Sequence, residues 1–315
     1  MPELTRPNQA HFFAALDDVR LDAVDAVDES AAPASLWADA WHSLRRQPLF
    51  WISAVLIVLV VVVAALPGLF TSVDPRFCEL KNSLADPRDG HLFGFDQQGC
   101  DIYARTIYGA RASVAVGILT TLVVVIIGGL VGAFAGFYGG WFDSLLSRIT
   151  DIFFAIPLVL AAIVVMQMFK QNRNILTVVI VLGVFGWPQI ARITRGAVMS
   201  VKNNDYITAA KALGSSRLMT LARHVMPNSA APIIVTATVS LGIFVVAEAT
   251  LSFLGIGLPP EITSWGADIS KASRSLRTQP SVMFYPSVAL ALTVLSFIMM
   301  GDAVRDALDP KARKR

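Results

Sequence analysis

Few side chains in this sequence have the type and spacing that chemistry requires. The two cysteines, Cys78 and Cys100, are too few for a disulfide-rich scaffold or a cluster of metal ligands, and they do not form a CxxC redox motif. Outside the cytoplasm, one disulfide between them is chemically reasonable. The sequence therefore favours a Cys78–Cys100 bridge in an extracytoplasmic segment, with two free thiols as the alternative.

Motifs of familiar catalytic chemistry are absent from the sequence. It contains no phosphate-binding loop of the form GxxxxGK[ST], no HExxH and no recognisable Ser-His-Asp arrangement. The chain by itself therefore cannot be an ATPase, and an intramembrane enzyme would need a catalytic pair that nothing supplies. We expect no catalytic residue and no metal site. Surface or packing roles are expected for the scattered histidines His11, His42, His91 and His224.

Charged side chains in or beside apolar runs are the remaining candidates. Glu248 falls within an apolar run, and an ionisable residue in a membrane span is a functional candidate by default. It could line a translocation path or bind a cationic substrate group. It could equally accept hydrogen bonds that hold a helix bundle near its outer end. Arg148 and Asp151 are spaced to pair on one helix, which predicts an interfacial ion pair.

The apolar residues occur in long uncharged blocks. They make up 55% of the chain against 16% of charged residues, and this excess does not correspond to a soluble core. Each block is near the roughly 20 residues that cross a bilayer, and in hydrocarbon only a helix of this length satisfies its own backbone. We expect Pro157 to kink the third of these helices and Pro188 the fourth. The sequence predicts an all-α integral membrane protein with six transmembrane helices, at residues 49–66, 112–137, 152–169, 175–193, 230–255 and 282–300.

The segments outside these helices differ in composition. Residues 1–34 are polar and acidic, without the basic start and apolar core of a signal peptide, and predict a flexible cytoplasmic tail. An interfacial helix is expected next, because Trp37 and Trp41 share one face beside arginines and Ser35 is a plausible N-cap. The expected order after the tail is an interfacial helix at 35–48, a first transmembrane helix at 49–69, an extracytoplasmic loop at 70–111, a five-helix core at 112–303 and a basic cytoplasmic tail at 304–315.

Basic residues near the span ends predict the orientation. With six spans, the segments before the first, between the fourth and fifth, and after the sixth lie on one side. These segments hold the larger share of lysine and arginine, although the opposite loops hold some, and the more basic side faces the cytoplasm. Both termini and residues 204–228 are therefore expected in the cytoplasm. The residues concerned are Arg45, Arg46, Arg192, Arg195, Lys202, Lys211, Arg217, Arg223, Arg305, Lys311, Arg313, Lys314 and Arg315.

Residues 204–228 form the longest polar, basic segment between two apolar ones. Asp205 occupies an N-cap position and Gly214 a C-cap position of a first helix, and Ser215 or Ser216 can cap a second, which Pro227 ends. The segment is too polar to enter a bilayer, so it predicts a helical hairpin. The expected apolar faces are Tyr206, Ala209, Ala210 and Leu213 in the first helix and Leu218, Leu221, Ala222 and Val225 in the second, opposite Arg217, Thr220 and His224.

The same segment resembles the coupling helix of ABC-importer permeases. The family pattern is Glu-Ala-Ala, three residues, Gly, nine residues, Ile, any residue and Leu-Pro. Ala209, Ala210, Gly214 and Pro227 keep its spacing, whereas Thr208, His224 and Met226 depart from it. In the family this helix docks on the ATPase subunit; the alternative is an ordinary hairpin packed on its own bundle. The resemblance implies coupling roles for Asp205, Tyr206, Ala209, Ala210, Lys211, Leu213, Gly214, Arg217, His224 and Pro227.

Three further stretches resemble the dipeptide, oligopeptide and nickel permeases. Residues 91–114 resemble the segment before their second span, although Cys100 stands where the family usually has arginine, which favours a local structural use of this cysteine. Residues 248–266 contain the LSFLGxG and SWG patterns that recur in the family, and residues 301–315 match its ending. The resemblance covers residues 35–315 and indicates the second, C-type permease, with the type I ABC importer permease fold and a cytoplasmic coupling-helix hairpin.

This resemblance implies a non-catalytic subunit of an ATP-driven, binding-protein-dependent importer of di- or oligopeptides in the bacterial inner membrane. The chain would form half of the pathway with a second homologous permease. Two ATP-binding subunits would hold ATP and magnesium, and an extracytoplasmic binding protein would deliver the substrate. No cofactor of its own and no nucleic-acid partner are expected. The alternative is an ATP-independent secondary transporter or channel, but the internal repeat or paired broken helices usual in such proteins are not evident in the sequence.

Overall fold

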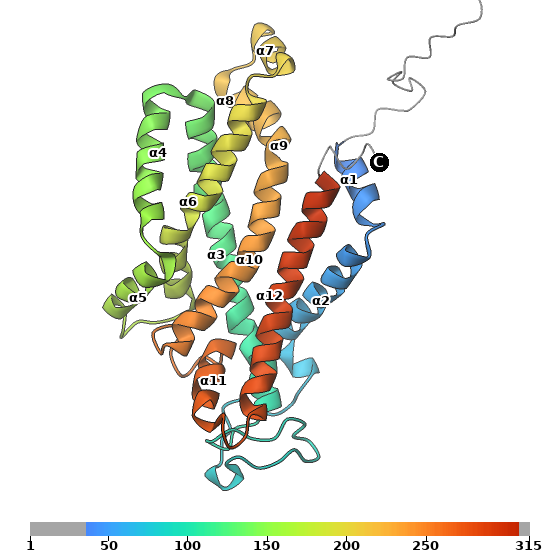
Figure 1. Ribbon diagram of the computed structural model, residues 1–315, viewed down its shortest axis with the longest axis vertical. Helices are drawn as coiled ribbons and strands as arrows, with labels where there is room; N and C mark the ends of the chain where they lie inside the picture. The colour runs from blue at the N-terminus through green and yellow to red at the C-terminus, as the bar shows by residue number, and fades with distance from the viewer. Residues whose placement is uncertain (1–35, 309–315) are drawn as a thin grey trace, which may run out of the picture.

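The computed structural model describes residues 36–308, and within them the chain is helical, with isolated β-bridges only in the loop before α3 (Figure 1). The expected acidic tail, Ser35 and residues 309–315 of the expected basic tail lie outside the described residues. The helices are α1 Leu36–Leu44, α2 Pro48–Ala65, α3 Ile102–Tyr138, α4 Gly140–Ala155, α5 Leu158–Met168, α6 Ile175–Val201, α7 Asp205–Ala212, α8 Arg217–Thr220, α9 Met226–Asn228, α10 Ala230–Phe253, α11 Trp265–Ala272 and α12 Ser281–Leu308.

Five of these helices, α2, α3, α6, α10 and α12, are each long and apolar enough to cross a membrane. The third predicted span, residues 152–169, is not one straight helix. The chain there consists of α4 and α5, bent by 81° at the break, and the described residues hold six spans if this pair counts as one. Ile156 is extended immediately before Pro157, as proline disfavours helical geometry in the preceding residue. The predicted kink at Pro157 is therefore a complete break.

The other spans extend beyond their apolar blocks. Helix α3 begins at Ile102, where the side chain of Asp101 caps it by accepting from the Ala104 amide at 2.6 Å, so residues 102–111 are helical rather than loop. Helix α6 continues through Pro188 to Val201. Hydropathy marks only the apolar part of a helix, and the polar first and last turns lie outside its signal.

The most extensive helix contact joins α3 to α6. Gly128, Gly132 and Gly136 lie four residues apart on α3, and a methyl group added to any of them would overlap the backbone of α6. At Gly136 it would lie 2.8 Å from the carbonyl oxygen of Arg195. The small-xxx-small spacing thus brings the two helix backbones together, as such spacing does in membrane bundles.

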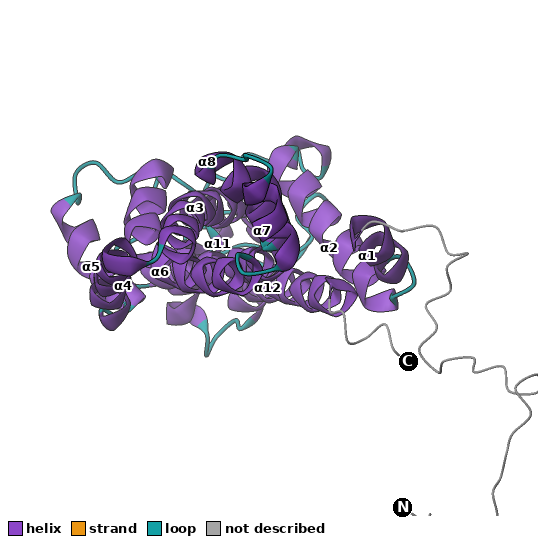
Figure 2. Ribbon diagram, turned by 90° about the horizontal axis from the view of Figure 1, so that it is seen from above, coloured by secondary structure: helices purple, strands orange, loops and turns teal. Residues whose placement is uncertain are grey.

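The two ends of the molecule carry different features. Helices α7 and α8 lie at one end, with α1 and the last turns of α12 toward the same end, and α11 lies at the opposite end with the loop before α3 (Figure 1). Seen along the long axis, α7 and α8 lie over the middle of the molecule, with α4 and α5 on one side and α1 and α2 on the other (Figure 2). Helix α1 packs against α12, and the exposed Trp41 lies edge-on to Phe50, as suits an interfacial helix.

Candidate functional site

The hairpin at residues 204–228 is a helix, a turn and a second helix. Helix α7 begins at Asp205, and Asn204, rather than Asp205, holds the N-cap position, without a side-chain hydrogen bond. Gly214 follows α7 with φ of +91°, a conformation that glycine adopts without a steric penalty. The hydroxyl of Ser216 then caps α8 by accepting from the Met219 amide at 3.3 Å. The predicted turn at Gly214 is present.

One side of the hairpin is anchored to the bundle. Ile207, Leu221 and Val225 are buried together with Ala133 of α3 and Val198 of α6. The helical periodicity pointed to Leu221 and Val225 but missed Ile207, because Ile207 lies opposite the alanine-containing face. Thr220 was expected on the polar face and is instead fully buried, where its hydroxyl lies 3.0 Å from that of Ser215.

The other side of the hairpin is exposed. Tyr206 is 46% exposed, Leu213 89% and Leu218 59%, so the predicted apolar face of α7 does not pack on the chain's own bundle. These exposed apolar side chains lie together at the end of a polar hairpin, the kind of patch that often contacts another protein. Of the ten predicted coupling residues, the half-buried ones are Ala210 and His224, and the exposed ones are Asp205, Tyr206, Ala209, Lys211, Leu213, Gly214, Arg217 and Pro227.

The sequence predicted that the second helix ends at Pro227, and the structure differs. A π-helical turn spans Leu221–Val225, and Pro227 lies in the first turn of α9, where the missing amide hydrogen costs nothing. The Asn228 side chain donates to the carbonyl of His224 at 2.6 Å across this junction. The hairpin therefore continues through α8, the π turn and α9, and Ser229 alone separates α9 from α10. An almost continuous helical path joins the exposed surface to the bundle.

Glu248 is fully buried in α10 and hydrogen-bonded on both oxygens. Ser113 of α3 donates to Oε2 at 2.8 Å and Ser252 donates to Oε1 at 2.7 Å. The hydroxyl oxygen of Ser113 also accepts from the Trp265 amide of α11, at 3.3 Å, and that of Ser252 accepts from Leu258. This arrangement supports the alternative in which Glu248 holds α3, α10 and α11 together.

The loop before α3 is held by a covalent bond and by backbone hydrogen bonds. Cys78 and Cys100 are joined by a disulfide, and Cys100 is fully buried. The Asp96 carboxylate accepts from the amides of Gln98 at 2.8 Å and Cys100 at 2.9 Å. A side-chain carboxylate that satisfies several backbone amides fixes a turn that has no ladder of its own.

A buried ion pair at this end of the fold joins α3 to α11. Arg105 near the start of α3 donates twice to Oδ1 of Asp268 in α11, from Nε at 3.0 Å and from Nη2, and once to the carbonyl of Pro75 at 3.2 Å. Burial raises the pKa of the Asp268 carboxyl, and the charge and hydrogen bonds of Arg105 oppose this rise. Sequence spacing could not pair these two residues.

Across residues 36–308, no group of three or more histidine, cysteine or carboxylate side chains lies close enough together to hold a metal ion.

Comparison with known families identifies the class. The family described as "Binding-protein-dependent transport system inner membrane component" matches residues 128–314, and "N-terminal TM domain of oligopeptide transport permease C" matches residues 35–87. The chain belongs to the family of inner-membrane components of binding-protein-dependent transport systems. It is homologous to permeases of ABC importers, as the resemblance in its sequence predicted.

Two relatives show how closely it fits within that family. The oligopeptide transport system permease protein OppC of Bacillus subtilis (strain 168) is 36% identical over 293 residues, which cover 93% of this chain and 95% of the relative. The glutathione transport system permease protein GsiD of Escherichia coli O6:K15:H31 (strain 536 / UPEC) is 36% identical over 278 residues, which cover 88% of this chain and 91% of the relative.

A solved structure shares the fold. It shows inward-facing conformations of the MetNI methionine ABC transporter, and the likeness has a TM-score of 0.52 at 18% identity, covering 64% of this chain and 95% of that one. The expectation of an all-helical type I ABC importer permease fold is confirmed.

Proposed function

We propose that the chain is one of two permease subunits of an ATP-driven importer of di- or oligopeptides. The named relatives act on oligopeptides and on glutathione, itself a small peptide, which supports a peptide as substrate here. In this proposal the chain forms half of the translocation pathway and a second homologous permease forms the other half. Two ATP-binding subunits bind ATP and magnesium, and an extracytoplasmic binding protein delivers the peptide.

The exposed face of the α7–α8 hairpin is the observation that carries this proposal. Leu213 and Leu218 lie in water in the isolated chain, and Ala209 offers a small side chain that another surface can approach closely. Burying the apolar side chains against a partner is worth about 25 cal/mol per Å². The anchored side, through Ile207 and Val225, would pass a movement of that partner to α3 and α6. Such coupling requires contacts that differ between two states of the ATPase.

The orientation in this proposal places the hairpin and both termini in the cytoplasm. Lys211 and Arg217 of the hairpin, Arg45 after α1 and Arg305 near the end of α12 belong to the basic segments. The disulfide-bonded loop lies at the opposite end of the fold, which an oxidising outer compartment suits (Figure 1). The permease core therefore spans the bacterial inner membrane, with the loop before α3 outside.

The test is to replace Leu213 with glutamate and purify the tagged chain from its native membrane in mild detergent. Leu213 is 89% exposed, so Leu213→Glu leaves the fold of the chain intact while placing a charge in the docking surface. The matched control is Leu80→Glu, at a leucine that is 78% exposed in the outer loop. We expect an ATP-hydrolysing subunit and a second permease to copurify with wild type and with the control, and the ATPase to be lost from Leu213→Glu.

Two results would contradict the proposal. If the wild-type chain purifies alone and moves solute without ATP, it is an ATP-independent carrier. If Leu213→Glu retains the ATPase and normal ATP-driven uptake, the hairpin does not dock on it.

A further inference from the structure

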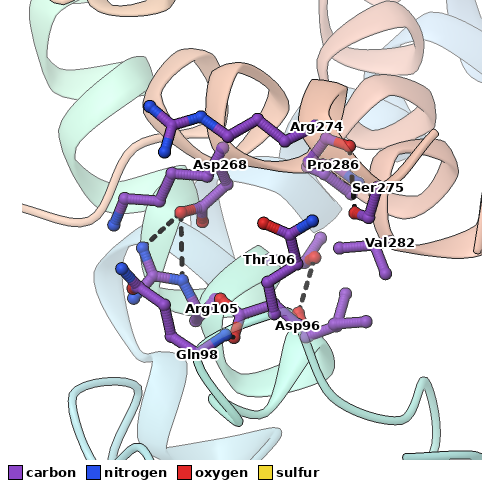
Figure 3. Close-up of a pocket in the computed structure, with 13 residues that line it drawn as sticks. Asp96, Gln98, Arg105, Thr106, Asp268, Arg274, Ser275, Val282 and Pro286 are labelled. Atoms are coloured by element: carbon purple, nitrogen blue, oxygen red, sulfur yellow. Dashed lines mark hydrogen bonds and ion pairs between the residues drawn. The ribbon is translucent and has the colours of Figure 1, made fainter. Parts of the chain in front are cut away.

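A small, partly open cavity lies at the outer end of the fold (Figure 3). Its volume is about 200 Å³, and its walls come from the loop before α3, the start of α3, α11 and the start of α12. Charged and polar side chains line much of it, among them Asp96, Gln98, Arg105, Asp268 and Lys271. Apolar side chains such as Val282 close one side. None of these residues belongs to the hairpin that carries the proposed coupling.

The ion pair in its wall is not fully satisfied. Both hydrogen bonds that Arg105 donates to Asp268 go to Oδ1, and its third goes to the carbonyl of Pro75. Figure 3 shows the side chains of Arg105 and Asp268 facing each other. Oδ2 of Asp268 is buried and has no hydrogen-bond partner within residues 36–308. An unpaired buried acceptor is costly unless a donor reaches it. The wall thus holds an acceptor that a ligand's ammonium or amide group would satisfy after a small rotation of the carboxylate.

Lys271 adds a cation without a direct ion pair to the same wall. It follows Asp268 by one helical turn on α11, is half-buried, and forms no ion pair or hydrogen bond with any residue that the structure describes. Burial lowers the pKa of its ammonium group and the Arg105 guanidinium acts in the same direction, whereas the carboxylates of Asp268 and Asp96 oppose this shift. A half-buried ammonium group without a partner is unfavourable, and a carboxylate beside it would relieve the cost.

The cavity adjoins a second hollow that is open to the surface. This second hollow has a volume of about 420 Å³, and Gln98, Arg105 and Lys271 line both spaces. Arg76 lies in the second hollow, so its entrance carries another positive charge, and Glu261 lies there as the one carboxylate among its lining residues. A ligand arriving from the outer face therefore meets cationic groups before it reaches Lys271.

We propose that this cavity binds the carboxylate end of a short peptide or an amino acid, with Lys271 as its main partner. Arg105 supplies the second positive charge, and Asp268 accepts a hydrogen bond from the nearest nitrogen of the ligand. The volume is below the range of about 300–1,000 Å³ usual for sites that enclose a whole ligand, so the site takes a terminal residue and leaves the rest of a peptide outside. This inference rests on the proposed function, because it names a point at which the imported substrate is held.

The test measures binding to the assembled importer in lipid nanodiscs by calorimetry. The probes are tri-alanine and tri-alanine with an amidated C-terminus, which differ in the carboxylate alone. We expect the amide to bind about tenfold or more weaker than the acid, the effect of losing one charge-assisted contact of about 1.4 kcal/mol. Lys271→Gln should lower the affinity for tri-alanine by a similar factor and leave the affinity for the amidated peptide unchanged. Lys271→Arg should bind both peptides with the affinities of wild type.

The matched control is Arg277→Gln. Arg277 is an exposed cation of the same outer segment and does not line the cavity, so its loss should leave the affinities of both probes unchanged. A melting temperature of Lys271→Gln equal to that of wild type shows that the variant is folded.

Four results would overturn the site. Tri-alanine and its amide could bind equally, Lys271→Gln could bind tri-alanine as wild type does, or wild type could fail to bind tri-alanine while importing it. If Lys271→Gln loses affinity for the binding protein but keeps its affinity for tri-alanine, Lys271 serves protein docking, and the proposed peptide site is overturned. Absence of ATP-dependent peptide uptake by the wild-type importer would instead contradict the proposed function, so the two failures are distinguishable.

Discussion

Asp143 in the first turn of α4 and Arg195 in α6 form a two-pronged ion pair, with Nε of the arginine 2.6 Å from Oδ1 and Nη2 2.7 Å from Oδ2. Asp151, two turns further along α4, pairs with Arg192 of α6 at 2.7 Å. Arg195 and Arg192 lie on one side of α6, so both pairs hold α4 against the same helix. The bend between α4 and α5 leaves α4 without a straight continuation, and these ion pairs add to the anchorage that Phe153 provides by packing on Trp187 of α6.

Reversing the charges of the pair should reveal this anchorage. Asp143→Arg and Arg195→Asp should each lower the free energy of unfolding by about 1 kcal/mol, because each leaves a partly buried charge facing its like. The double variant restores opposite charges at the same two positions and should recover most of that loss. Thermal unfolding of the detergent-solubilised chain measures all three. Losses that simply add in the double variant would show that the two side chains do not interact.

The two roles considered for Glu248 give opposite results on substitution. Replacement by leucine removes the acceptor for the hydroxyls of Ser113 and Ser252, and an unpaired buried hydroxyl costs about 1–3 kcal/mol. Glu248→Leu should therefore lower the melting temperature markedly. Glu248→Gln keeps one acceptor and adds a donor to the other hydroxyl, so it should stay close to wild type both in stability and in peptide uptake.

A transport role would show a different pattern for the same pair of variants. If Glu248 lines the path or binds a cationic group, Glu248→Gln should reduce uptake while the melting temperature stays unchanged. Uptake measured in proteoliposomes, beside the melting curve of the same preparation, separates the two roles.

Local sequence signals predicted the turn of the hairpin and the approximate positions of the spans. Gly214 between two short helical patterns predicted the turn, since only a residue tolerant of positive φ fits there. Apolar length predicted the spans, and Pro157 predicted a disturbance in the third. The size of that disturbance, an 81° bend, was not predictable from the proline alone, because it depends on how α4 and α5 pack on α6.

Contacts between distant segments account for what the sequence did not show. Arg148 and Asp151 have helical spacing that favours a local pair, yet Asp151 pairs with Arg192, which lies 41 positions away. Arg105 and Asp268, separated by 163 positions, meet only because α11 packs on the start of α3. Neither pairing leaves a periodic signal in the sequence.

Removal of the disulfide should loosen the outer loop without unfolding the bundle. The bond between Cys78 and Cys100 closes a loop that is otherwise held by hydrogen bonds and by contacts such as the stacking of Phe93 on Tyr285. Closing a loop of this length is worth about 3 kcal/mol in chain entropy. The variant with both cysteines replaced by serine should be cleaved faster by trypsin at the exposed Lys81, with little change in helix content.

Reducing agent supplies the control for the disulfide. It should make the wild-type loop as sensitive to trypsin as that of the serine variant, and it should have no effect on the serine variant. Equal cleavage rates of wild type and variant under oxidising conditions would show that the bond does not restrain the loop.

The glycines of α3 offer a matched pair for the contact with α6. A methyl group on Gly132 would overlap the carbonyl oxygen of Ala191 and lie 2.8 Å from Cβ of Thr194, whereas one on Gly129 would meet no atom within 4 Å outside its own helix. Gly132→Ala should therefore destabilise the chain by about 1–3 kcal/mol through overpacking. Gly129→Ala should stabilise it by up to about 1 kcal/mol through helix propensity. Thermal unfolding compares the two, and a change of the same sign for both would show that α3 and α6 are not in close backbone contact at Gly132.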